Sequence, residues 1–267
     1  MVIMVSRSTA FRFLSALVLL FFLAGCGVPL GEHWSGYRPG QGAEPSTAAD
    51  SPAAAAKPPA PAAPDCRRVK CVALTFDDGP GAYTEALLKL LDEHNAKATF
   101  FLIGKNVERH PGIARDEVAA GHEIGNHTFS HQDLTKLSLA AGQRELRKTE
   151  EAIKKATGAT PTLVRPPYGV IPKGLKKSLD VPVALWSVDT LDWKTRDTKK
   201  TTQAAEKIAP GSIVLMHDIH KSTLEAMPKI LTDLGAQGYH FVTVSQLVGN
   251  PKPGIAYGTG LHPGGKG

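Results

Sequence analysis

Two carboxylates and two histidines are the side chains of this chain best suited to chemistry. Asp77 and Asp78 are adjacent in the string FDDGP, and adjacent carboxylates on an extended turn point to different sides. One can then bind a metal while the other accepts a proton. His127 and His131 lie four residues apart in NHTFSH, a spacing at which both can face one metal from a single helical turn. Two histidines and one carboxylate leave coordination positions open, which favours a catalytic metal over a structural one.

Each of these motifs also has an ordinary explanation. FDDGP can be a polar turn that caps the following helix, because Gly79 and Pro80 force a sharp turn. Chance can bring two histidines close together in a chain that contains 10 of them. The chemical interpretation therefore depends on further reactive side chains at the same place.

Three more strings supply such side chains. In RPPYG, Pro166 restricts Arg165 to an extended backbone, so that a fixed guanidinium near Asp77 can keep that carboxylate ionised. DTLDW contributes Asp189, Asp192 and Trp193, and LMHD contributes His217. A histidine oriented by a buried aspartate is a suitable general acid, because imidazole titrates near neutral pH. For Trp193, ordinary core packing is the alternative.

Strand-like and helix-like segments alternate along the part of the chain that carries these strings. Apolar, β-prone runs predict strands at residues 72–76, 97–103, 123–124, 162–164, 183–188, 213–216 and 241–244. Helical patterns lie between them at residues 83–95, 113–120, 139–158, 201–209 and 223–236. This alternation, with about seven repeats in about 185 residues, predicts a parallel α/β barrel. Functional residues of such barrels lie at the C-terminal ends of strands, which is where the five strings fall.

The strings TFDDGP, HTFSH, RPPYG, DTLDW and LMH stand in the order found in polysaccharide deacetylases. Residues 66–250 therefore resemble the catalytic domain of carbohydrate esterase family 4, also called the NodB-homology domain. One motif would be weak evidence, whereas five in order are specific. The resemblance implies a distorted (β/α) barrel that is often short of eight repeats.

The resemblance also implies a role for each matching residue. The catalytic group comprises the base Asp77, its orienting Arg165, the acid His217 and its partner Asp192. The metal ligands are Asp78, His127 and His131. The substrate contacts are the backbone N–H of Tyr168 toward the oxyanion, and Trp193 and Leu215 as walls of the acetyl-methyl pocket. Four other polar residues have no role in this scheme and are expected to be structural: Asp189, His122, Asp218 and His220.

The expected reaction is metal-dependent removal of N-acetyl groups from a glycan that contains N-acetylglucosamine, with release of acetate. Zn²⁺ is the expected metal, and Co²⁺ or Ni²⁺ suits the same ligands. The motifs do not separate amide from ester, so hydrolysis of O-acetyl esters on xylan or another glycan is an alternative. A non-catalytic glycan-binding lipoprotein is a further alternative, and it predicts that no acetate is ever released.

The N-terminal segment has the features of an export signal. Arg7 and Arg12 precede an apolar run at residues 13–24, which is too short to span a bilayer as a helix. An uncleaved anchor or a buried helix is the alternative. The string LAGC resembles the bacterial lipobox, which makes residues 1–25 a lipoprotein signal peptide and Cys26 the lipid anchor. We therefore expect an exported protein, held at the outer face of the cell membrane or secreted.

Residues 26–65 follow as a predicted disordered tether, since 16 of the 22 residues from 43 to 64 are Ala or Pro. A tether of this kind keeps a domain near the cell wall, so peptidoglycan is the first expected substrate, ahead of chitin oligomers and wall-attached polymers. Cys66 and Cys71, in CRRVKC, are expected to form a disulfide in an exported protein, and two free thiols is the alternative. Residues 251–267 are predicted to form a disordered tail.

Composition and charge exclude several classes of protein. The chain has 267 residues, of which 42% are hydrophobic and 21% charged, which excludes a wholly disordered, collagen-like or polytopic membrane protein. Residues 1–65 contain four basic and four acidic side chains, so the net charge of +6 belongs to residues 66–267. No block of Lys and Arg interleaved with aromatic residues occurs there, and nucleic acid is not an expected partner. The expected state is a monomer beside an anionic wall.

Overall fold

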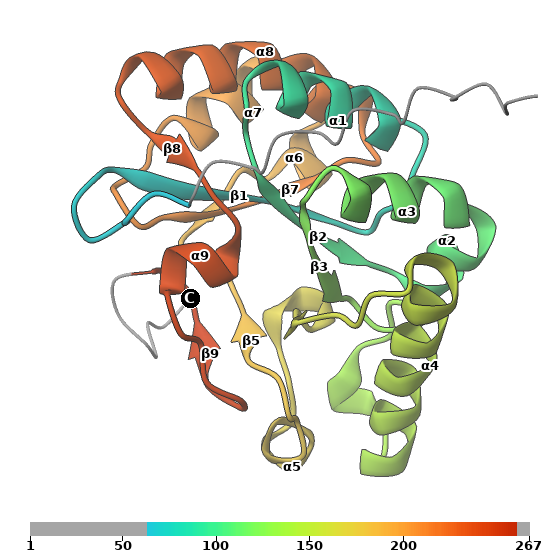
Figure 1. Ribbon diagram of the computed structural model, residues 1–267. Helices are drawn as coiled ribbons and strands as arrows, with labels where there is room; N and C mark the ends of the chain where they lie inside the picture. Colours follow the sequence, from blue (N-terminus) through green and yellow to red (C-terminus); the bar gives the residue numbers. More distant parts are fainter. Residues whose placement is uncertain (1–62, 261–267) are drawn as a thin grey trace, which may run out of the picture. The chain divides into compact units, whose positions relative to one another are not determined.

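A computed structural model describes residues 63–260, in which strands and helices alternate (Figure 1). The strands are β1 (Cys71–Asp77), β2 (Ala98–Leu102), β3 (Glu123–Asn126), β4 (Leu163–Val164), β5 (Val183–Ala184), β6 (Val188–Asp189), β7 (Ile213–His217), β8 (His240–Phe241) and β9 (Ala256–Tyr257). The α-helices are α1 (Thr84–Glu93), α2 (Gly104–Arg109), α3 (Pro111–Ala119), α4 (Leu139–Thr157), α5 (Lys173–Lys177), α6 (Asp192–Thr195), α7 (Thr198–Ala205), α8 (Lys221–Ala236) and α9 (Val244–Val248). Within residues 63–260, no helix is both long and apolar enough to cross a membrane. The predicted signal peptide, Cys26 and nearly all of the predicted tether lie outside the described residues.

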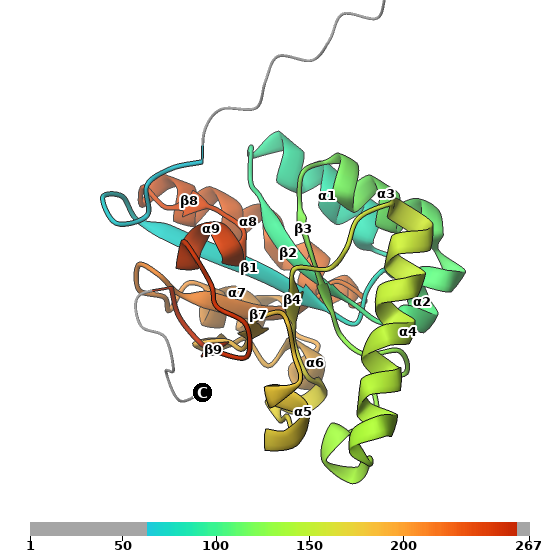
Figure 2. The ribbon, with the colours of Figure 1, turned by 60° about the horizontal axis from the view of Figure 1, so that its bottom comes forward.

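The strands form one sheet in the order β6-β7-β1-β2-β3-β4-β5-β9, and β8 pairs with β1. Every ladder between these strands is parallel. Strands β5 and β6 lie near opposite ends of this order, although only residues 185–187 separate them in the chain. So short a link spans at most about 14 Å, so the sheet must curl until its two edges approach each other. An antiparallel bridge between Ser212 and Thr259 joins the same two sides, and the predicted distorted barrel is confirmed (Figure 2).

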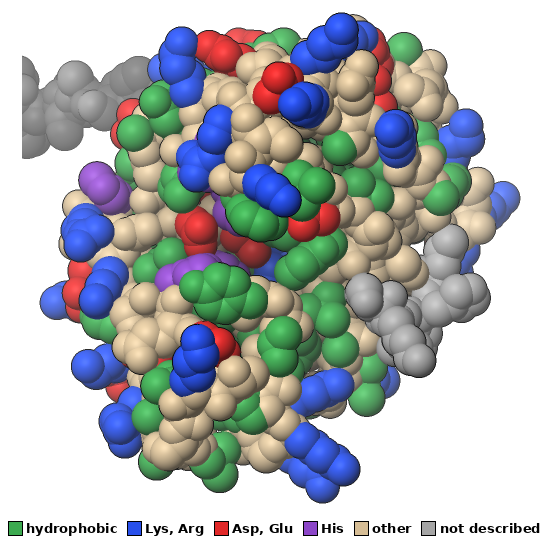
Figure 3. Space-filling model, turned by 180° about the vertical axis from the view of Figure 1, so that it is seen from behind, with side chains coloured by type: hydrophobic (Ala, Val, Ile, Leu, Met, Phe, Trp, Pro, Cys, Tyr) green, Lys and Arg blue, Asp and Glu red, His purple; other side chains and the backbone are tan. Residues whose placement is uncertain are grey.

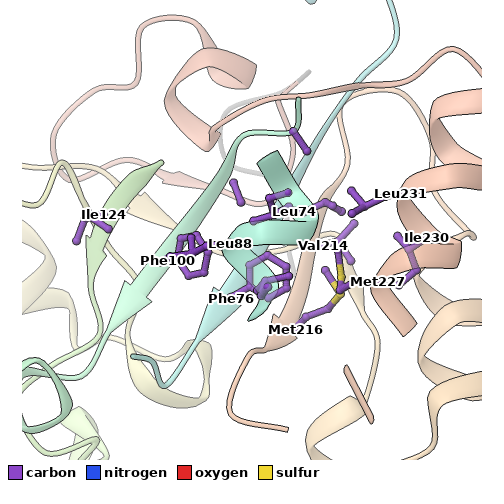
Figure 4. Close-up of a cluster of buried hydrophobic side chains, with 14 of the residues drawn as sticks. Leu74, Phe76, Leu88, Phe100, Ile124, Val214, Met216, Met227, Ile230 and Leu231 are labelled. Carbon is purple, nitrogen blue, oxygen red and sulfur yellow. The ribbon is translucent and has the colours of Figure 1, made fainter. Parts of the chain in front are cut away.

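Alternation along the strands separates the hydrophobic core from the residues of the barrel interior. Leu74 and Phe76 of β1 are fully buried in a cluster with residues of α1 and α8 (Figure 4). Successive side chains of a strand point to opposite faces, so Thr75 and Asp77 face the interior of the curled sheet. A strand whose two faces are both buried therefore delivers one carboxylate, Asp77, to the C-terminal edge of the sheet.

The single strand predicted at residues 183–188 is wrong. The structure has two short strands there, β5 and β6, which pair with different neighbours. A run of apolar residues predicts burial, but it carries no information about where the chain leaves one edge of a sheet and joins the other.

The disordered tail predicted from Pro251 is also wrong for residues 251–260. Strand β9 pairs with β5, and Tyr257 is only 6% exposed. The Tyr257 hydroxyl accepts a hydrogen bond from the backbone N–H of Lys252 at 3.0 Å. The Gly and Pro content of this segment predicts disorder. The two-residue strand β9 forms only because β5, which is distant in the sequence, offers an edge for pairing.

The described domain begins before the predicted boundary at Cys66. The carbonyl of Asp65 accepts hydrogen bonds from the backbone N–H groups of Arg68 and Val69, so this residue belongs to the first turn. Cys66 and Cys71 are joined in a disulfide that links this turn to the start of β1.

Candidate active site

The residues of the five motifs meet at the C-terminal edge of the sheet. Asp77 ends β1 and His217 ends β7, while His127 directly follows β3 and Arg165 directly follows β4. Neighbouring parallel strands end at the same edge, which brings side chains from four separate segments together. Figure 3 shows a hollow on one face of the molecule in which acidic and histidine side chains gather between hydrophobic ones.

Asp78, His127 and His131 form a group that can hold a metal ion, because one ligand atom from each lies within 4.8 Å of the others. The Nε2 atoms of both histidines lie 3.4 Å from Oδ1 of Asp78. That oxygen is buried and has no hydrogen-bond partner among the described residues. An orphaned carboxylate oxygen that faces two imidazole nitrogens fits a divalent cation.

The protonation of the two rings also suits a metal. Nδ1 of His127 lies 2.7 Å from the carbonyl oxygen of Arg165. Because a carbonyl only accepts, Nδ1 must carry a hydrogen, and Nε2 is the ring nitrogen that faces Asp78. Burial lowers the pKa of His131, against the opposing charge of Asp78, and so favours the neutral ring that a metal requires.

The histidines do not share a turn of helix as the spacing predicted. Residues 127–133 form a loop in which Thr128 and His131 have φ values of 65° and 56°. The ring centroids of His127 and His131 are nevertheless 5.0 Å apart. Spacing alone could not distinguish a helix from a loop that folds back on itself.

The buried guanidinium of Arg165 holds the carboxylate of Asp77 in place. Its Nη1 atom donates to Oδ1 of Asp77 and to Oγ1 of Thr75, both at 2.7 Å. The guanidinium is fully buried, lies 4.0 Å from the ring centroid of Phe101, and donates to the carbonyls of residues 184–185. Burial lowers the pKa of Arg165, but the Asp77 carboxylate opposes this effect and stabilises the cation. The sequence analysis missed Thr75, although its position two residues before Asp77 places it on the same face of β1.

Asp192 and His217 form a second buried pair. Oδ1 of Asp192 lies 2.8 Å from Nδ1 of His217, and Oδ2 accepts from the His217 backbone N–H and the Thr223 hydroxyl, both at 2.7 Å. Burial opposes the imidazolium, yet the hydrogen bond and charge of Asp192, with Asp77 and Asp78, raise the pKa of His217 to about 9. Burial would likewise raise the pKa of Asp192, but its hydrogen bonds from His217 and Thr223 lower it. The His217 ring therefore carries a proton on both nitrogens at neutral pH.

The Asp192→Asn variant tests this pair. An amide cannot support the imidazolium by charge, so the pKa of His217 should fall and the protonated ring should be lost at a lower pH. We expect about 10²-fold lower kcat/KM at pH 8, with the alkaline limb of the pH profile moved to lower pH. Asp180→Asn, at an exposed carboxylate, is the control. An unmoved alkaline limb would contradict the assignment.

Two aromatic residues close to the site are exposed, and the ring centroid of Tyr168 lies 5.1 Å from that of His131. Tyr168 is 68% exposed and Trp193 is 46% exposed, whereas Leu215 is buried. Core packing therefore does not explain Trp193. Its Nε1 atom lies 3.4 Å from Oδ1 of Asp189, which also accepts from the backbone N–H of Leu191. Asp189, for which no role was predicted, thus orients the indole.

Of the other unassigned residues, His122 lies just before β3 at the N-terminal edge of the sheet, away from the site, whereas His220 lies beside the site. Nδ1 of His122 accepts a hydrogen bond from the backbone N–H of Ala98 at 3.2 Å, and burial lowers the pKa of His122 to about 4. His220 contacts Arg196 and packs beside His217, with ring centroids 5.9 Å apart. His122 thus contacts the first residue of β2, while His220 packs against the imidazole of His217.

Burial of Asp218 destabilises the folded state by an amount that depends on pH. Asp218 is fully buried, accepts the Thr84 hydroxyl with one oxygen, and its other oxygen has no partner among the described residues. Burial raises its pKa from 3.8 to about 7. The folded state therefore retains a proton that the unfolded state has lost, and stability falls as pH rises from about 4 to about 7.

In the metal-free protein, Asp218→Asn should remove this pH dependence. We expect the variant to gain roughly 4 kcal/mol of unfolding free energy relative to wild type between pH 4 and pH 8, measured by urea denaturation. Asp180→Asn, at an exposed position, should gain nothing. A constant difference between Asp218→Asn and wild type across this range would show that Asp218 does not titrate in this way.

Fold and site together define a class of protein, curled parallel α/β sheets with a candidate metal centre at the C-terminal edge. Residues 65–181 match the family model described as polysaccharide deacetylase. The peptidoglycan-N-acetylglucosamine deacetylase PgdA of Listeria monocytogenes is 44% identical over 191 residues, which cover 70% of this chain and 40% of that protein. The chain thus spans about two fifths of the length of this curated relative.

Solved structures show the same likeness. One described as T48 deacetylase with substrate is 48% identical, with a TM-score of 0.71, over 73% of this chain and 100% of that one. The family 4 carbohydrate esterase from Streptomyces lividans, in complex with acetate, is 34% identical, with a TM-score of 0.64, over 68% of this chain and 96% of that one. The chain belongs to the polysaccharide deacetylase family, carbohydrate esterase family 4.

Proposed function

We propose that this protein removes acetyl groups from N-acetylglucosamine residues of cell-wall peptidoglycan and releases acetate. The observation that carries the proposal is the convergence of the metal triad, Asp77 and His217 in one hollow. PgdA of Listeria monocytogenes, named for this reaction, supports the choice of substrate. Zn²⁺ is the proposed metal, held by Asp78, His127 and His131, since imidazole and carboxylate ligands suit it.

Asp77 is the proposed base. Its Oδ1 atom is held by Arg165, while Oδ2 lies 3.6 Å from Nε2 of His127 and faces the metal triad. When bound, a divalent cation lowers the pKa of a water molecule and polarises the acetyl carbonyl. Asp77 is placed to take up the proton of the attacking water, and Arg165 keeps that carboxylate oriented as it does so.

His217 is the proposed acid. An amine leaves poorly unless it is protonated, and a histidine with a pKa of about 9 carries the proton at neutral pH. After the proton is transferred to the leaving nitrogen, Asp192 stabilises the tautomer that remains by its contact with Nδ1. We assign the backbone N–H of Tyr168 to the oxyanion, and Trp193 and Leu215 to the walls around the acetyl methyl group.

The N-terminal proposals concern residues that the structure does not describe. A lipid on Cys26 and the Ala- and Pro-rich segment after it would keep the domain between membrane and wall. This location supports peptidoglycan over a soluble glycan.

An acetate-release assay on three substrates tests the function. Zn²⁺-reconstituted protein is incubated with peptidoglycan, N-acetylglucosamine oligomers and acetylated xylan at equal acetyl concentration. We expect the fastest release from peptidoglycan, with free amines formed in equal amount to acetate. Acetate from xylan alone would establish an O-acetyl esterase, and no acetate from any substrate would leave only a glycan-binding protein. Equal rates on all three would show that location, not the site, sets specificity.

A further inference from the structure

One carboxylate of α4 reaches the loop that carries the two histidines of the metal triad. We propose that Glu145 is a positioning residue, which holds this loop in the conformation that binds the metal and thereby sets the metal affinity. The inference rests on the proposed metal site, but it does not depend on which glycan is the substrate. Glu145 is not itself one of the three possible ligands.

Three hydrogen bonds from the loop converge on a single oxygen of Glu145. Oε2 accepts from the backbone N–H groups of Phe129 at 3.1 Å and of Ser130 at 2.9 Å. It also accepts from the Ser130 hydroxyl at 2.9 Å. Both backbone donors lie between His127 and His131, so Glu145 holds the middle of the segment whose ends carry the ligands. Bonds to an ionised acceptor are stronger than those between neutral groups.

This loop needs external support, because its backbone is one that most residues avoid. Thr128 and His131 both have positive φ values, which are uncommon for residues other than glycine. Such conformations persist only where the surrounding structure determines them. A loop without its anchor would be free to relax toward ordinary backbone angles, and the two Nε2 atoms would then no longer face Asp78.

Other hydrogen bonds hold the loop by its carbonyls and by the residue that precedes it. Its carbonyls at Thr128 and Phe129 accept from the backbone N–H groups of Gly104 and Lys105, at the start of α2, at 3.0 Å each. Asn126, just before the loop, donates from its side chain to the carbonyl of Leu146 at 2.8 Å. Helix α2 thus holds two carbonyls of the loop, while Glu145 holds the amide groups of its two central residues. The amide groups of Thr128 and His131 donate within the segment, to Oδ1 of Asn126 and Oγ1 of Thr128. Loss of Glu145 would leave two amide groups of the loop without their acceptor.

The chain offers variants that separate position from charge. Glu145→Ala removes the acceptor, whereas Glu145→Gln keeps one oxygen at the same place and loses only the charge. Ser130→Ala removes one of the three bonds and leaves the two backbone bonds intact. Glu150→Ala is the matched control, because Glu150 is an exposed carboxylate on the same helix.

The decisive measurement is the affinity of the purified full chain for Zn²⁺, obtained by competition with a chromophoric chelator. We expect Glu145→Ala to weaken Zn²⁺ binding by 10- to 100-fold, the usual effect of removing a residue that orients metal ligands. Glu145→Gln and Ser130→Ala should each weaken Zn²⁺ binding by about 3- to 10-fold, and Glu150→Ala should match wild type. Circular dichroism of the metal-free proteins reports whether each variant is folded.

The outcomes decide the inference in each case. Zn²⁺ affinity within twofold of wild type in a folded Glu145→Ala protein would overturn it, and so would Glu145→Gln as weak as Glu145→Ala. Should Glu145→Ala not fold, Ser130→Ala decides, since unchanged Zn²⁺ affinity in that variant would equally overturn the inference. Wild type that binds Zn²⁺ but releases no acetate would refute the proposed function and leave this inference intact.

Discussion

Replacement of Asp77 by Asn should lower acetate release by about 10³-fold, within the usual range for removal of a general base. Asn has nearly the same shape as Asp, and its amide oxygen can still accept from Arg165, so the geometry of the site is kept. The amide cannot take up a proton from water. Because Asp77 is not one of the three proposed metal ligands, Zn²⁺ should still bind to Asp78, His127 and His131.

The same substitution has a second expected effect, on stability. Arg165 is fully buried, and Asp77 is the carboxylate that neutralises it. Removal of one member of a buried ion pair typically costs about 3 to 5 kcal/mol, so the Asn variant should unfold at lower temperature. The measurement is therefore made well below the melting temperature, with Zn²⁺ binding as the test of folding and Asp116→Asn as the control. A folded, Zn²⁺-loaded variant that retains more than a tenth of wild-type activity would remove Asp77 from the role of base.

Loss of the metal should abolish acetate release altogether. Full chelation is expected to reduce the rate to background, and added Zn²⁺ should restore it in wild type. The His127→Ala variant should stay inactive when Zn²⁺ is added, because it lacks one of the three proposed metal ligands. Exposed His110 offers the control, since His110→Ala should be inactivated by chelation and rescued by Zn²⁺ as wild type is.

His127 has a second contact that the experiment must take into account. Its Nδ1–H donates to the carbonyl of Arg165, so removal of the ring also leaves that buried carbonyl without a partner. The ring of His131 is less buried than that of His127. The His131→Ala variant therefore separates loss of a metal ligand from loss of the contact with the Arg165 carbonyl, and it should also be inactive. Acetate release that persists in either variant, or after complete chelation, would exclude a metal-dependent mechanism.

Much of the site could be predicted from local patterns. Asp77 ends a buried strand and Asp78 directly follows it. Arg165 and His217 likewise stand at or just after the ends of other strands, so parallel pairing alone brings these residues to one edge. The nature of the side chains limited the chemistry before their positions were known. Two histidines and a carboxylate fit a metal with open coordination positions, and a histidine beside a buried aspartate fits a proton donor.

Other features depend on contacts between distant segments. Thr223 reaches Asp192 across 31 residues, and Thr75 is reached by Arg165 across 90 residues, so no local pattern identifies either contact. The pairing of β9 with β5 likewise depends on an edge that exists only once the sheet has curled. Glu145 looks like an ordinary charged residue of an amphipathic helix until the loop that it holds is placed against it.

The sequence by itself therefore determined the class of fold, the order of the motifs and the types of reactive group, because strand alternation and strand ends are local properties. Only the tertiary structure decided the conformation of the segment from His127 to His131, the division of residues 183–188 into two strands, and the burial of Asp218. These features arise where one segment supplies hydrogen bonds or a hydrophobic surface to another. Their free energies belong to the contact between segments and not to either segment alone.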